Sequence, residues 1–173
     1  SNRAALCNFS QYVNQLGDTP VARTIMLIPI GSGVGVTSVS LGMVRAMERH
    51  GVNVSFFKPV AQPKPAHSGP EASTAVIRAG SNITPPEPLS LRYAENMISS
   101  GNTAVLLEEI VALYEKHVKE SGAEVVVVEG LVPVDKQPFA NKLNYDIASA
   151  LDADMVFVTH PANDSSQKLK ERI

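Results

Sequence analysis

The chain has 173 residues, enough for one domain with its own hydrophobic core but too few for two complete domains. Its formal net charge is −2, and its basic residues are scattered, so neither nucleic acid nor an anionic membrane surface is expected as a partner. The single cysteine, Cys7, provides neither a disulfide framework nor a thiolate metal site, which predicts a reducing, cytoplasmic location.

Residues 1–20 show no sustained period and end in the turn signal Gly17-Asp18-Thr19-Pro20. We interpret them as an N-terminal extension or a tag remnant. The patterned domain is expected to cover residues 21–173. The segment SSQKLKERI at its end indicates a helix without a capping residue behind it, so the domain is expected to be incomplete at its C-terminus.

Four short apolar runs rich in Val, Ile and Phe predict strands buried on both faces of a sheet. They lie near 24–30, 52–57, 123–128 and 154–159. Stretches of helical period separate them, and we expect helices close to 36–49, 71–80, 103–121 and 139–153. This alternation predicts an α/β fold with a mainly parallel sheet and helices on both faces.

The segment IPIGSGVGVTS joins the first predicted strand to the first predicted helix. Its glycines allow a tight turn with exposed backbone N–H groups, and the helix that follows adds the positive end of its dipole. Val36 occupies the place where phosphate-binding loops of this kind carry lysine, and the spacing between Gly31 and Gly35 is one residue short. The alternative is a turn needed only for close packing. The candidate anion-binding residues are Gly31, Ser32, Gly33, Gly35, Thr37 and Ser38.

Two polar residues follow other predicted strands. Lys58 comes just after the second strand and Glu129 just after the third. In a parallel sheet both would lie at the edge that holds the glycine loop, where the lysine could offset phosphate charge and the carboxylate could orient a metal or its waters. The alternatives are a solvated Lys58 stiffened by Pro59 and a Glu129 that caps a loop.

From RTIMLIPIGSGVGVTSVSLGMVRAMERHGV through FFKPVAQP, VVVVEGLVP and LNYDIASALDADMVFV to LKERI, the sequence resembles the N-terminal domain of the long, multidomain form of bacterial phosphate acetyltransferase. More distantly it is similar to dethiobiotin synthetase, a P-loop ATP-dependent enzyme with corresponding KP and EG motifs. The resemblance implies a P-loop NTPase-like, dethiobiotin synthetase-like fold. Val36 departs from the synthetase but fits the acetyltransferase relatives.

The resemblance also implies a regulatory, non-catalytic domain, because acetyl transfer between acetyl-CoA and phosphate belongs to a separate C-terminal domain of that family. No catalytic residue is carried over to this chain. The implied partners are the remaining domains of the same polypeptide, in a homo-oligomer. No cofactor is required, although a nucleotide or NADH could act as a weak effector. An ATP-dependent synthetase-like enzyme and a purely structural oligomerisation module remain as alternatives.

The histidines show no spacing typical of metal ligands, and no metal site is predicted. They are His50, His67, His117 and His160. Glu108 and Glu109 are expected on a solvated helix face rather than as an acid/base pair.

Overall fold

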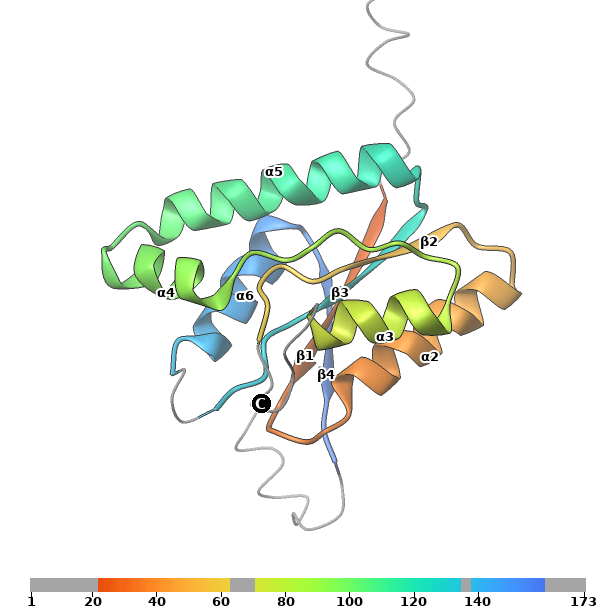
Figure 1. Ribbon diagram of the computed structural model, residues 1–173, viewed down its shortest axis with the longest axis horizontal. Helices are drawn as coiled ribbons and strands as arrows, with labels where there is room; N and C mark the ends of the chain where they lie inside the picture. The colour runs from red at the N-terminus through yellow and green to blue at the C-terminus, as the bar shows by residue number, and fades with distance from the viewer. Residues whose placement is uncertain (1–21, 63–70, 135–137, 161–173) are drawn as a thin grey trace, which may run out of the picture.

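A computed structural model describes residues 22–62, 71–134 and 138–160, and all structural statements below concern these residues. The chain forms a parallel sheet with helices on both faces (Figure 1). The predicted extension at 1–20 and the helix expected at 165–173 lie outside the described residues. The predicted α/β class is confirmed.

The sheet consists of four parallel strands in the order β2-β3-β1-β4. Their bounds are Arg23–Pro29 for β1, Val54–Phe57 for β2, Val125–Glu129 for β3 and Asp154–Val158 for β4. The predicted strands agree with these bounds to within about two residues. All residues of β2, and the last four of both β1 and β3, are buried. Burial on both faces explains why the apolar runs do not alternate.

Two apolar clusters attach the helices to the two faces of the sheet. The first contains Leu27, Phe56 and Val127 and lies against α2 and α3. The second contains Met26, Phe57 and Val126 and lies against α4, α5 and α6 (Figure 1). The helix bounds are Val36–Arg49 for α2, Ala72–Gly80 for α3, Leu91–Ser99 for α4, Thr103–Ser121 for α5 and Ala140–Ala150 for α6. In the described part of the chain, no helix has the length and hydropathy that crossing a bilayer requires.

Helix α4 was not predicted from the sequence. Its N-cap is Ser90, whose hydroxyl accepts a hydrogen bond from the backbone N–H of Tyr93 at 3.2 Å. Its apolar residues Leu91, Ala94, Met97 and Ile98 recur at helical spacing and pack on the core, although only Ala94 is buried. This spacing, together with the serine cap after the proline-rich turn at 83–90, could have revealed the helix.

A polar layer joins α5 to the sheet. The Ser55 hydroxyl and His117 Nε2 are 2.6 Å apart, and the hydroxyls of Thr24 and Tyr114 are also 2.6 Å apart. Burial lowers the pKa of His117 and raises that of Tyr114, because each charged form would lose hydration in the core. His117 is therefore held in the core by packing and by its hydrogen bond with Ser55.

Candidate functional site

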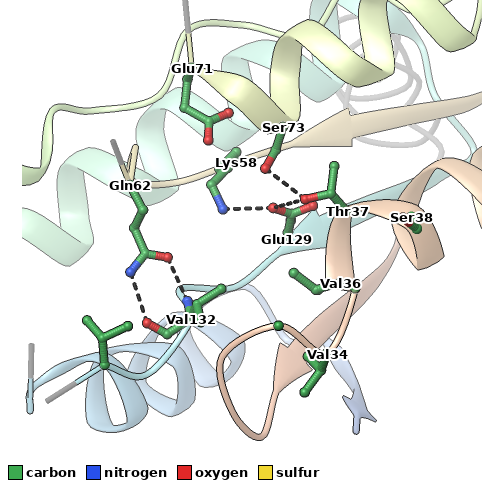
Figure 2. A pocket seen from close by; sticks show the side chains of 13 residues that line it. Val34, Val36, Thr37, Ser38, Lys58, Gln62, Glu71, Ser73, Glu129 and Val132 are labelled. Atoms are coloured by element: carbon green, nitrogen blue, oxygen red, sulfur yellow. Dashed lines mark hydrogen bonds and ion pairs between the residues drawn. The ribbon is translucent and has the colours of Figure 1, made fainter. Parts of the chain in front are cut away.

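A pocket of about 420 Å³ opens at the C-terminal end of the strands, between the glycine loop and the segments that follow β2 and β3 (Figure 2). This is the edge where an open parallel sheet commonly binds ligands. The lining residues are Gly33, Val34, Gly35, Val36, Thr37, Ser38, Lys58, Gln62, Glu71, Ser73, Glu129, Val132 and Val134. Six of the eight candidate residues therefore line one pocket, whereas Gly31 and Ser32 do not line it.

The glycine loop turns by left-handed backbone conformations at two positions. Gly33 has φ of 73° and Gly35 has φ of 79°. Residues with a side chain rarely adopt this conformation, so both positions favour glycine. At Gly31, by contrast, φ is not positive and an added Cβ would meet only a side-chain atom of Val34 at 4.0 Å. The left-handed residues point the chain directly into α2.

Helix α2 begins at the pocket with its N-terminal N–H groups uncapped by any side chain, and its first turn holds no acidic residue. These groups and the helix dipole form a weak positive field at the pocket wall. Val36, at the first helical position, is only 5% exposed and packs in the apolar cluster with Leu27 and Val158. A lysine at this position would have to leave that cluster to bring its charge into the pocket.

Lys58 and Glu129 form a buried ion pair at the back of the pocket. Lys58 Nζ lies 2.8 Å from Glu129 Oε1, and the two side chains are 2% and 1% exposed. The ammonium group also lies 3.5 Å from the carbonyl oxygen of Gly130. The solvated Lys58 and the loop-capping Glu129 considered as alternatives are therefore both wrong. The lysine does lie at the pocket, but its charge is balanced by a carboxylate rather than left open to a ligand.

Hydroxyl groups complete the hydrogen bonding of Glu129. Ser40 donates to Oε2 at 3.0 Å, and Thr37 donates to Oε1 at 3.4 Å. Thr37 also lies 3.0 Å from the hydroxyl of Ser73 on α3 (Figure 2). Sequence reasoning identified Thr37 but missed Ser40 and Ser73. Ser40 could have been found as a polar residue four positions after Val36, on the apolar face of the helix.

A second buried residue fixes the turn after β3. Asn144 of α6 accepts a hydrogen bond from the N–H of Leu131 and donates to its carbonyl oxygen, both at 2.8 Å. A Cβ added at Gly130 would lie 2.9 Å from Asn144 Oδ1 and 3.0 Å from the Leu27 carbonyl oxygen, so only glycine fits there. Together these contacts set the direction in which the chain leaves Glu129. Asn144, which the sequence analysis did not consider, is a positioning residue.

The outer wall of the pocket joins two loops. Gln62 accepts from the N–H of Val132 at 2.6 Å and donates to its carbonyl oxygen at 3.0 Å, as a peptide group would (Figure 2). Glu71 caps α3 by accepting from the N–H of Thr74 at 2.8 Å. The charged side chains that line the pocket are Lys58, Glu71 and Glu129, which gives a formal charge of −1. This charge opposes the binding of a highly charged anion.

No group of three or more His, Cys, Asp or Glu side chains in the described ranges is arranged to hold a metal ion. Neither His50 nor His160 lines the pocket, and His67 lies outside the described residues. Glu109 is engaged at the surface, where it accepts a hydrogen bond from the Tyr93 hydroxyl at 2.6 Å. That bond raises the pKa of Tyr93, since the ionised phenol could no longer donate it.

A family model described as an AAA domain matches residues 23–169. The chain belongs to this family. The P-loop-like fold implied by the resemblance is thereby confirmed, although its loop lacks the lysine.

Curated proteins that the chain matches include phosphate acetyltransferases. The protein of Escherichia coli (strain K12) is 52% identical over 154 residues, and that of Haemophilus influenzae is 42% identical over 153. Each match covers 88% of this chain and 21% of the relative. The chain therefore spans about a fifth of the length of these relatives and is homologous to their N-terminal part, as the resemblance implied.

We expect Lys58→Met to lower the free energy of unfolding by about 3–5 kcal/mol, because Glu129 would be left buried without its counter-charge. The double variant Lys58→Met/Glu129→Gln should be more stable than the single variant, since no buried charge then remains. Urea denaturation of the three proteins measures both effects.

Arg78→Met is the matched control, because Arg78 pairs with Glu87 at 3.0 Å on the exposed surface. Loss of that pair should cost less than about 1 kcal/mol. A Lys58→Met variant that is no less stable than Arg78→Met would show that the buried pair does not organise the site.

Proposed function

We propose that this chain is the regulatory, non-catalytic N-terminal part of a phosphate acetyltransferase. The homology to proteins of that name, and the fifth of their length that the chain spans, support this assignment. Conversion of acetyl-CoA and phosphate to acetyl phosphate and CoA would then take place elsewhere in the same polypeptide. A cytoplasmic, homo-oligomeric protein is part of the proposal.

The non-catalytic role is supported by the two positions at the pocket where a P-loop enzyme would place a positive charge. Neither has a side-chain cation that is free to contact a ligand. The loop position is occupied by Val36, which packs in the core. The one lysine among the lining residues, Lys58, is paired with Glu129. Phosphoryl transfer depends on cations placed against the charge of the transferred group, and neither position leaves a side-chain cation for that purpose.

The pocket retains the means to bind a small anion. The uncapped backbone N–H groups at the start of α2 lie at its wall, and Thr37 and Ser38 are among its lining residues. The formal charge of −1 on the lining favours ligands of low charge over a triphosphate. We therefore propose a metabolite effector that binds weakly, in about the micromolar to millimolar range, and that needs no further cofactor. Pyruvate, phosphate and NADH are the ligands to test first.

An ATP-dependent enzyme of the dethiobiotin synthetase type is the rival function. The approach of Thr37 to Glu129, at 3.4 Å, favours it, because a hydroxyl beside a carboxylate is also suited to holding a hydrated magnesium ion. In that function Lys58 would have to exchange Glu129 for a phosphate group. A third possibility, a structural module for oligomerisation, would require no ligand.

We expect the chain to hydrolyse ATP with Mg²⁺ no faster than the buffer background, because the cation that stabilises the transition state is missing. Val36→Lys alone should not create activity, since Lys58 and Glu129 remain paired. A phosphate-release assay measures this. Steady turnover that Lys58→Ala abolishes would contradict the proposal and favour the synthetase-like rival.

We expect at least one of pyruvate, phosphate and NADH to bind more tightly than ATP, and Gly33→Ala to weaken that binding about tenfold by distorting the amide-bearing loop. Calorimetry and ligand-detected NMR measure both effects. Gly51→Ala is the matched control: Gly51 has φ of 74°, almost that of Gly33, but lies after α2 and does not line the pocket. If no anion binds to the folded chain at millimolar concentration, the glycines serve packing alone. The proposed effector site would then be wrong, and a structural module would be the better description.

A further inference from the structure

The pocket at the C-terminal end of the strands has two walls of different chemistry (Figure 2). One wall is the glycine loop with the start of α2. The other is the segment that follows β3, from which Val132 and Val134 line the pocket. The volume of about 420 Å³ lies within the range of about 300–1,000 Å³ that is common for small-molecule sites. The chemistry of the two walls therefore limits the kind of molecule that fits.

The segment after β3 offers a ligand hydrocarbon rather than hydrogen-bond donors. The backbone N–H groups of residues 130–132 donate in turn to the Leu27 carbonyl oxygen, Asn144 and Gln62, at 2.9, 2.8 and 2.6 Å. The next residue is a proline, which has no N–H. What remains at this wall are the side chains of Val132 and Val134, and Val134 is 39% exposed. An apolar group can displace water from these valines, whereas an anion finds no donor here.

The opposite wall has the donors. Among the described residues, the backbone N–H groups of residues 33–36 have no hydrogen-bond partner, and all four residues line the pocket. They lead into the uncapped start of α2, where the helix dipole adds partial positive charge. The side chains of this stretch, Val34 and Val36, carry no charge of their own. An anionic group is therefore better placed at this wall than at the opposite one.

The charges at the pocket favour a ligand with one negative charge. Lys58 and Glu129 neutralise each other at the back of the pocket. Glu71 is the remaining charged residue of the described lining, and its Oε2 accepts a hydrogen bond from the N–H of Thr74 at 2.8 Å. Each further negative charge on a ligand would be repelled by this carboxylate, without a free side-chain cation in the described lining to offset it.

We infer that the pocket takes an aliphatic monocarboxylate, whose carboxylate group lies at the start of α2 and whose hydrocarbon chain lies against Val132 and Val134. The inference rests on the proposed function, which places a weakly bound effector in this pocket, and it narrows that effector to one chemical class. Inorganic phosphate has no hydrocarbon to place against the valines, and a nucleotide carries several negative charges.

An NMR titration of the 173-residue chain with straight-chain carboxylates from acetate to hexanoate tests the inference, with phosphate as the anion that lacks hydrocarbon. The dissociation constant should fall about three- to fourfold for each methylene group added, until the chain is longer than the apolar wall. Hexanoate should bind at least about tenfold more tightly than phosphate. The amide signals of residues 33–36 should shift with every carboxylate, and the methyl signals of Val132 and Val134 only with the longer ones.

A pair of variants tests where the hydrocarbon chain lies. Val132→Thr keeps the shape of the side chain but replaces a methyl group by a hydroxyl. It should weaken hexanoate binding about threefold and leave acetate binding unchanged, because acetate does not reach that wall. Val76→Thr is the matched control, since Val76 on α3 is 43% exposed and does not line the pocket; it should change neither affinity. An equal loss for both ligands in Val132→Thr would contradict the inferred placement.

The titration also separates failure of the inference from failure of the proposed function. Equal affinities for acetate and hexanoate, or tighter binding of phosphate than of hexanoate, would overturn the inference and leave an effector site for another anion. Shifts that do not saturate would show adsorption of the hydrocarbon to the surface and would overturn the inference as well. No binding by any anion would overturn both the inference and the effector site.

Regulation has a separate measurement, the formation of acetyl phosphate by the longer protein. If a carboxylate saturates the pocket without changing that rate, the result counts against the regulatory role. The assigned ligand class would then still be supported by the titration.

Discussion

The buried ion pair of Lys58 and Glu129 is the interaction on which the site depends. Two charges removed from water cost several kcal/mol each unless their geometry is good and their remaining hydrogen bonds are made. Here Ser40 and Thr37 satisfy the carboxylate, and the Gly130 carbonyl lies beside the ammonium group. These hydrogen bonds connect the ends of β2 and β3 to the first turns of α2. The back of the pocket is therefore formed by two charged groups that are bonded to each other.

At Val36, in the glycine loop, an apolar residue packs in the core where a charged residue would otherwise face the ligand. In a phosphate-binding loop a lysine at this position supplies charge to the ligand. Here valine joins Leu27 and Val158 in the core and stabilises the contact of α2 with the sheet. The loop has left-handed glycines at positions 33 and 35, and hence exposed amides, but carries valine rather than lysine at position 36. Under the proposed function, such a loop would sense a ligand rather than transform it.

Much of the fold could be predicted because each strand is a short apolar run and most helices have a clear period. Helix α4 escaped prediction although Leu91, Ala94, Met97 and Ile98 recur at helical spacing, because it is only nine residues long and follows a proline-rich turn. At the site, the strand ends located Lys58 and Glu129, because a parallel sheet brings them to one edge. Their mutual pairing could not be predicted, since it depends on side-chain direction and on the register between β2 and β3. Ser40, Ser73 and Asn144 escaped for the same reason: their roles arise only from packing between elements distant in sequence.

Lys58 is paired with Glu129, and we expect it to remain so in the presence of a ligand. NMR of the Lys58 ammonium group detects the hydrogen bond and the charge state of the nitrogen. The spectrum is recorded before and after addition of MgATP and of phosphate at millimolar concentration. We expect an ammonium signal that is already that of a hydrogen-bonded group in the free chain and that stays unchanged with either ligand. A signal that shifts to a new position on saturation with MgATP, together with loss of its coupling to Glu129, would contradict it.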